Sequence, residues 1–223
     1  MKGKFAFVLC ALFCAVSVSA FAEDECFYLG ANYSYLTAGG YGSHAVGGHL
    51  SFVEDRVYAA VGFLADVSGD RNIEMEEMRG LGVGKFETKT YAVPMRVGYP
   101  FMLGGESATF TIIPALAVDA QFLRADFGQE IDGYEMNYKM SGFGATVGAA
   151  LNIGMQHRIG RVCLMYGIDM DFGLLSFAVY RFDYSGYVSK KHVAGSGEGT
   201  SFSSVADGLQ FAVSPYLCVG FSL

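Results

Sequence analysis

The feature that most constrains this chain is its C-terminal stretch, residues 209–223, which alternates apolar with small or polar side chains. Successive side chains of a strand point to opposite faces, so this pattern predicts one long amphipathic strand. The stretch exceeds the roughly 9–11 residues that a strand needs to cross a bilayer at a tilt. The apolar series is Leu209, Phe211, Val213, Pro215, Leu217, Val219, Phe221 and Leu223.

Similar alternation predicts seven earlier strands, at about residues 26–37, 44–53, 57–67, 88–99, 108–123, 138–155 and 161–180. The longest links are expected as loops at about 68–87, 124–137 and 181–207. Antiparallel neighbours would place the short turns and both termini at one end and these loops at the other. Pro94 and Pro114 each lack a ladder donor, which predicts a bulge at both positions.

The N-terminus has the features of an export signal. Lys2 and Lys4 precede the apolar run 5–18, and residues 20–22 form a small-x-small cleavage pattern. We expect a signal peptide over 1–22, export through the Sec pathway, and one barrel domain over 23–223. No later segment approaches the ~18 consecutive apolar residues of a membrane helix, so a membrane location would depend on strands.

Composition favours a membrane barrel over a soluble one. The chain has 30 glycines, 14 tyrosines, 19 phenylalanines and no tryptophan, and aromatic residues could supply the interfacial girdles of such a barrel. A secreted soluble barrel with its apolar face inward is the alternative. It would expose lysines and glutamates, yet the second faces of the first, sixth and eighth predicted strands carry none. A net charge of −7 without a basic cluster argues against a nucleic-acid partner.

This arrangement resembles the bacterial outer-membrane barrels of the OmpA, OmpX and OmpW types, although the final residue is Leu223 where that family normally ends in an aromatic. The resemblance implies an all-β, eight-stranded antiparallel up-and-down transmembrane β-barrel in the outer membrane. Outer-membrane lipid and the barrel assembly machinery would be its partners, and we expect a monomer. We expect a surface protein that acts through extracellular loops as an adhesin, host-factor binder or envelope-structural protein. A small solute channel of the OmpW type is the alternative.

Six charged or titratable residues fall on the predicted inner face. Buried charges must be paired or solvated, so they predict a polar network that fills the lumen. A narrow pore, or a gate formed by Arg96 with an aspartate, would use the same side chains. The residues are His49, Asp66, Arg96, Asp119, Asp169 and Asp171.

His49 and Ser51 lie two residues apart, a spacing that resembles the His-x-Ser pair of outer-membrane lipid A deacylases. That family's pair faces lipid, whereas this one is predicted to face inward. A lipid-modifying enzyme is therefore only a remote alternative, and we predict no catalytic residues, cofactor or metal.

Three cysteines remain after the predicted cleavage: Cys26, Cys163 and Cys218. The first and last strands of a closed barrel are neighbours, so Cys26 could form a disulfide with Cys218. Cys163 could also pair with Cys218. An odd number leaves at least one thiol unpaired.

Alternation of aromatic residues continues into the last predicted loop. Such residues predict either an ordinary surface hairpin or an exposed strand edge that binds an extracellular or host ligand. They are Tyr180, Phe182, Tyr184 and Tyr187.

Overall fold

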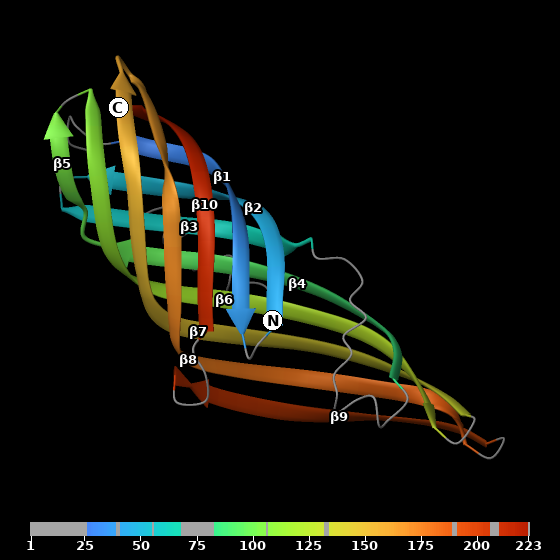
Figure 1. The fold of residues 1–223 in the computed structure, drawn as a ribbon. Coiled ribbons are helices and arrows are strands. Elements are labelled where there is room, and N and C mark those ends of the chain that lie inside the picture. The colour runs from blue at the N-terminus through green and yellow to red at the C-terminus, as the bar shows by residue number, and fades with distance from the viewer. Residues whose placement is uncertain are drawn as a thin grey trace, which may run out of the picture.

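The computed structural model describes residues 26–38, 41–54, 56–67, 83–105, 107–131, 134–188, 191–205 and 210–222. The predicted signal peptide lies outside these residues. Nearly all of the described chain is strand (Figure 1). Among these residues no helix is long and apolar enough to cross a membrane.

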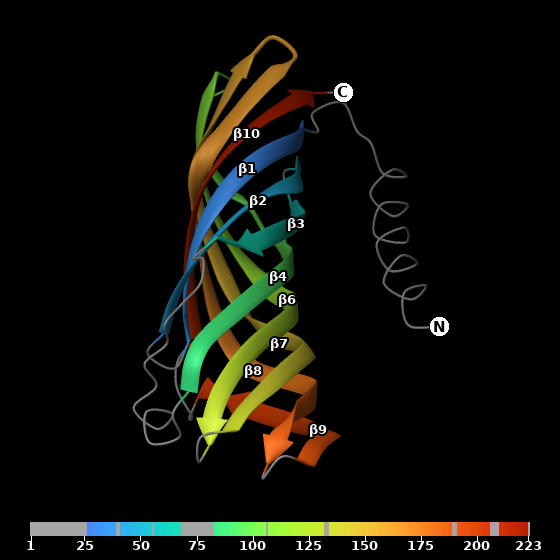
Figure 2. The same ribbon diagram turned by 90° about the vertical axis from the view of Figure 1, so that its right-hand side faces the viewer.

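Eight strands form a closed antiparallel ring, in the order β10, β1, β2, β3, β4, β6, β7, β8 and back to β10. This confirms the predicted eight-stranded up-and-down transmembrane barrel. Figure 2 shows the strands inclined around the ring. Their bounds are β1 (Cys26–Ala38), β2 (Tyr41–Glu54), β3 (Val57–Asp66), β4 (Val83–Gly98), β6 (Ala108–Ile131), β7 (Tyr134–Ile159), β8 (Val162–Val188) and β10 (Gln210–Ser222).

Two further strands extend members of this ring. β5 (Phe101–Gly105) follows β4 and pairs with the same neighbour, β6. β9 (Lys191–Ser204) precedes β10 and pairs with the part of β8 that lies beyond β10. β8 therefore pairs with β10 over residues 162–173 and with β9 over residues 175–188.

The outer surface of the ring is apolar and carries aromatic residues toward both ends. Near the termini these include Phe27, Tyr99, Phe101, Tyr166 and Phe221, and near the other end Tyr33, Tyr35, Phe63, Tyr91, Phe122 and Phe143. Between them the exposed side chains are aliphatic, such as Leu116, Ile168 and Leu217. Two aromatic belts around an aliphatic band are the surface that a bilayer requires.

The prolines do not cause bulges, so that expectation was wrong. The pairing of β4 with β6 keeps its register past Pro94, and the pairing of β6 with β7 keeps its register past Pro114. Pro94 instead lies where the ladder with β3 is interrupted, between Val61↔Met95 and Leu64↔Ala92. Pro114 lies where β4 gives way to β5, and its carbonyl accepts a bond from the Tyr99 N–H at 3.1 Å.

Much of the chain expected as loops is strand. Residues 124–131 and 134–137 lengthen β6 and β7, residues 181–188 and 191–204 belong to β8 and β9, and residues 83–87 belong to β4. Residues 68–82, 132–133, 189–190 and 206–209 lie outside the described part of the chain. Backbone hydrogen bonds between neighbouring strands continue these strands beyond the apolar band.

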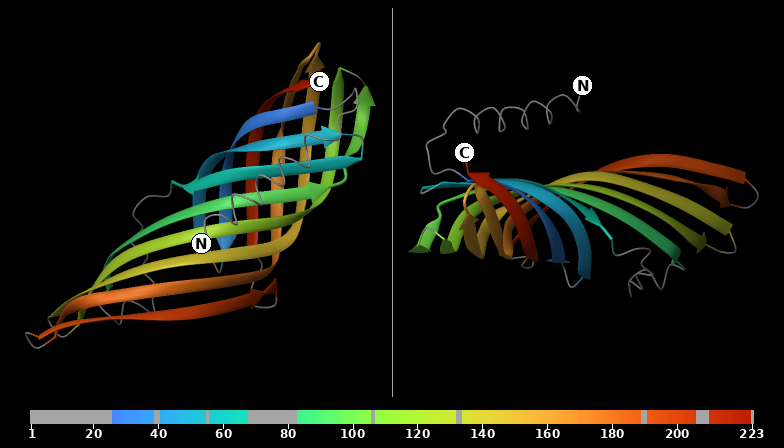
Figure 3. Two further views of the ribbon diagram at one scale, coloured as in Figure 1. Left: turned by 180° about the vertical axis from the view of Figure 1, so that it is seen from behind. Right: turned by 90° about the horizontal axis from the view of Figure 1, so that it is seen from above.

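These extensions form a projecting sheet, which we define as β9 together with the ends of β4, β6, β7 and β8 farthest from the termini. Figures 1 and 3 show it continuing past the level at which β1, β2, β3 and β10 end. Within the described part of the chain, β9 pairs with β8 alone and residues 83–88 of β4 pair with β6 alone, so each forms an edge of this sheet.

Candidate functional site

The lumen at the end with the termini is filled by a packed core. Tyr28, Tyr58, Ile113, Met165 and the three cysteines are all buried there. They come from the inward-facing positions of several strands, so their side chains meet at the barrel axis. Eight strands leave an interior only wide enough for packed side chains, and this half of the barrel is closed.

Above this core lies an ion-paired group that we call the lumen plug: Arg96, Asp169, Asp171, Asn152 and Tyr216. Arg96 is 4% exposed and donates from Nε to Asp171 Oδ1 at 2.9 Å and from Nη2 to Asp171 Oδ2 at 2.5 Å. Its Nη1 lies 3.8 Å from Asp169 Oδ2. Two parallel hydrogen bonds between a guanidinium and a carboxylate fix the relative orientation of Arg96 and Asp171.

Asn152 and Tyr216 complete the lumen plug. Asn152 donates from Nδ2 to Asp169 Oδ1 at 2.6 Å, and the Tyr216 hydroxyl donates to Asn152 Oδ1 at 3.0 Å. The bonds thereby connect β4, β7, β8 and β10 across the lumen. The register places Asn152 directly opposite Asp169, and Tyr216 is opposite Gly167, two residues away on the same strand.

Other predicted lumen residues lie on either side of the lumen plug. Asp66 and Asp119 line a cavity of about 60 Å³ together with Arg96 and Asp171. This is room for only a few water molecules. His49 lies nearer the termini, where its Nε2 is 3.1 Å from Cys218 Sγ and its ring meets Tyr216 edge-on at 5.6 Å.

The His49 and Ser51 side chains are both buried inside the barrel. The alternation of side chains along the strand predicted this inward orientation, which separates the pair from lipid. Among the described residues no group of three or more His, Cys, Asp or Glu side chains is placed to hold a metal ion.

The cysteine pairing expected from strand order was wrong. Cys26 is opposite Ser222, whereas Cys218 is opposite Gly30, so Cys26 and Cys218 lie at different levels of the β1–β10 pair. The sulfurs that meet are those of Cys26 and Cys163, at 2.9 Å. All three cysteine side chains are buried.

A bulge at Leu174 changes which side chains of β8 face inward. Val147 of β7 pairs with Leu175 and the next residue, Gly148, pairs with Gly173, so Leu174 is an extra residue on β8. Before it, Asp169 and Asp171 face the lumen; after it, the even-numbered residues do. Leu174 also stands where β8 leaves β10 and begins to pair with β9.

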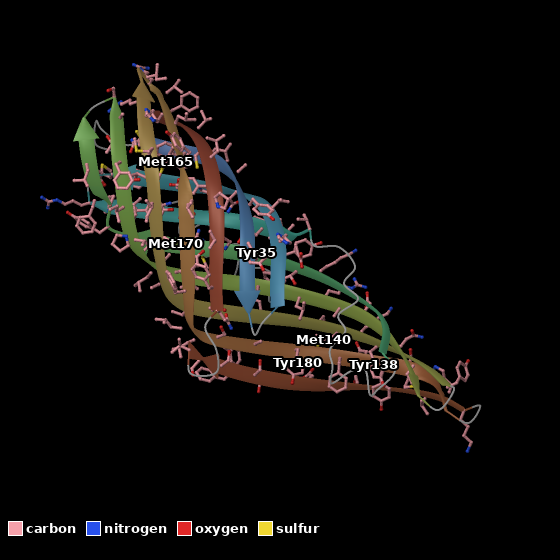
Figure 4. All side chains as sticks on the ribbon, viewed as in Figure 1. Tyr35, Tyr138, Met140, Met165, Met170 and Tyr180 are labelled. Carbon is pink, nitrogen blue, oxygen red and sulfur yellow. The ribbon has the colours of Figure 1, made fainter. Side chains whose placement is uncertain are left out.

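As a result, aromatic side chains cover the inner face of the projecting sheet. Tyr184 pairs with Tyr138, whose ring is 6.3 Å away, and Phe182 pairs with Met140. Figure 4 labels Tyr138, Met140 and Tyr180 at this end of the molecule. We call Tyr138, Met140, Tyr180, Phe182 and Tyr184 the aromatic ledge.

Three glycines of β9 lie beneath rings of the aromatic ledge. Gly195, Gly197 and Gly199 pair with Tyr184, Phe182 and Tyr180. A Cβ at these glycines would lie 2.5 Å from Tyr184 Cζ, 2.6 Å from Phe182 Cε1 and 2.5 Å from Tyr180 Cε2. The glycines are therefore required for the rings to lie across the neighbouring strand. Tyr187, predicted with these residues, lies on the opposite face and meets the His192 ring at 5.4 Å.

The outer face of the same strands marks the edge of the apolar band. Leu175, Phe177 and Val179 are exposed and apolar, and the next two outward residues are Arg181 and Asp183. Their side chains interact at 3.4 Å. Charged pairs belong in water, so the aromatic ledge lies at and beyond the membrane boundary.

No protein-family model and no curated protein matches this chain. Solved structures with a similar architecture include Neisserial surface protein A (11% identity over 89% of this chain and 97% of that one, TM-score 0.39). The N-terminal β-barrel domain of Pseudomonas aeruginosa OprF is similar at 12% identity over 88% and 96%, TM-score 0.40. The attachment invasion locus protein Ail of Yersinia pestis is similar at 10% identity over 90% and 99%, TM-score 0.38. These similarities are ones of architecture.

Proposed function

We propose that this chain is an outer-membrane surface protein whose closed barrel anchors the projecting sheet, and that the aromatic ledge binds an extracellular ligand. The observation that carries the proposal is the position of the ledge. Its rings lie on the sheet just where the outer face turns from apolar to charged. Aromatic side chains that remain partly exposed outside a core are characteristic of binding surfaces.

The packed lumen supports a binding role over a channel. A solute would have to pass both the lumen plug and the packed core nearer the termini. No side chain of this site is assigned a catalytic role, because binding through the ledge needs none. Host macromolecules are the ligand class that an adhesin or host-factor binder would recognise.

Adhesion of cells that display three forms of the protein tests the proposal. The ledge variant carries Tyr180→Ser, Phe182→Ser and Tyr184→Ser. The matched control carries Arg181→Ser and Asp183→Ser, which lie on the opposite face of the same strand segment. Heat-modifiable migration on gels first establishes that each form is folded.

We expect wild type and control to adhere equally to immobilised host glycans and matrix proteins, and the ledge variant to lose at least about tenfold, or 1.4 kcal/mol. Equal adhesion by all three folded forms would contradict the ledge as the binding surface. Refolded wild type should be silent in planar bilayers, and sustained conductance would instead favour the channel.

A further inference from the structure

We infer that Cys26 and Cys163 form a disulfide that joins β1 to β8 across β10. The two cysteines are on strands that do not pair with each other, because β10 lies between them. Cys26 is opposite Ser222, and Cys163 is opposite Gly220, two residues away on β10. Both side chains face the lumen, where their sulfurs lie 2.9 Å apart. A covalent S–S bond is about 2.05 Å, so the two sulfurs must approach by a further ~0.9 Å to form one.

Gly220 permits this approach over the intervening strand. A Cβ at this position would lie 2.6 Å from Tyr28 Cδ1. Any larger side chain would therefore displace the Tyr28 ring, which packs with Cys26 and Cys163 in the same buried core.

Cys218 is excluded from the linkage. Its sulfur contacts His49 Nε2 at 3.1 Å, and the backbone at Cys218 pairs with Gly30 and Met165 rather than with either other cysteine. The inference therefore accounts for an odd number of thiols, with Cys218 as the one that stays reduced.

Burial determines when the bond can form. Cys26 is 2% exposed and Cys163 is fully buried, so a protein oxidant could not reach them in the closed barrel. Oxidation must precede or accompany closure, in an oxidising compartment such as the periplasm. A thiol–disulfide oxidoreductase in its disulfide form would be the oxidant. One cysteine thiolate attacks its disulfide to give a mixed disulfide, and the second cysteine thiolate then displaces the enzyme as a dithiol. Two electrons and two protons leave the chain.

Thiol counting on protein from outer-membrane fractions tests the inference. The protein is unfolded in the presence of an alkylating reagent, digested without reductant, and analysed by mass spectrometry. We expect one alkylated thiol per chain, at Cys218, and a linked pair of peptides containing Cys26 and Cys163. After reduction all three cysteines should react.

Three variants complete the experiment. Cys218→Ser should keep the linked peptides and leave no free thiol. Cys26→Ser and Cys163→Ser should lose them and each show two free thiols. Three free thiols in most wild-type chains, or a linkage that includes Cys218, would overturn the inference. The wild-type measurement does not depend on whether any variant folds.

Discussion

Replacing Arg96 with methionine tests whether the lumen plug stabilises the barrel. Methionine retains much of the packing volume but removes the guanidinium, so two aspartates remain in a lumen from which water is largely excluded. Asp169 and Asp171 are 2% and 7% exposed. Breaking a buried ion pair by removing one partner costs about 3–5 kcal/mol, because an uncompensated charge is left behind.

The assay should follow folded barrel by heat-modifiable gel migration against urea, since a chain without tryptophan offers no indole fluorescence. With a urea dependence of roughly 2 kcal/mol per molar, the midpoint for Arg96→Met should fall by about 2 M. The triple variant Arg96→Met, Asp169→Asn, Asp171→Asn should recover much of this loss, because the two carboxylates that Arg96 contacts are then replaced by neutral amides.

Arg124→Met is the matched control. Arg124 pairs with Asp126 at 3.5 Å, but its side chain is 66% exposed, so its loss should change stability by less than about 1 kcal/mol. If Arg96→Met and Arg124→Met shift the midpoint equally, the proposed role of the plug is refuted. Arg96→Met should also remain non-conducting, because the packed core nearer the termini is unchanged.

Three further predictions concern the lipid face, the ledge and the cysteines. Leu217 is at an outward position that is 56% exposed, so Leu217→Lys should destabilise the membrane-inserted barrel by about 2–4 kcal/mol. Gln210→Lys, inside the barrel, should destabilise it less. Equal folded fractions of the two variants on gels would mean that the faces are misassigned. Gly197→Val should displace the Phe182 ring and make β9 sensitive to limited proteolysis. Ser196→Val, on the other face of β9, should not. Identical digestion of the two variants would contradict the contact between the ring and the glycine. Reduction of the Cys26–Cys163 bond should lower the free energy of unfolding by about 2–4 kcal/mol, which a lower urea midpoint would show. The Cys218→Ser protein, which keeps this bond, should lose the same amount of stability on reduction as wild type.

The face of each barrel strand could be predicted from the sequence because lipid and packed lumen impose different side chains on alternate residues. Leu217 points outward, and Ser214, Arg96 and Asp169 point into the lumen, as this rule predicts. This rule predicts only whether a side chain points into or out of the barrel. It does not predict the height of the side chain along the barrel axis, which depends on how far each strand is displaced relative to its neighbours. The Cys26–Cys163 contact and the Asn152–Asp169 bond are both consequences of level, so neither could be predicted.

The ends of the strands were the other feature that the sequence did not predict. Beyond the bilayer no lipid selects apolar residues on one face, so glycine and polar residues such as those of β9 read as loop. The structure shows them paired with β8 residue by residue. The three glycines predicted to lie in a loop are instead the places where aromatic rings cross the neighbouring strand.

The single extra residue at Leu174 explains why the two parts of β8 present different chemistry to the same side of the sheet. Within the barrel, the inward positions carry Asp169 and Asp171, which need a partner because they are buried. Without the bulge, the same parity would continue and place Arg181 and Asp183 inward and the rings of Tyr180 and Phe182 outward. Since β7 has no matching insertion, Met140 and Tyr138 would then face away from those rings. One bulge, at the point where β8 passes from β10 to β9, therefore turns the aromatic residues of β8 onto the face that carries Tyr138 and Met140.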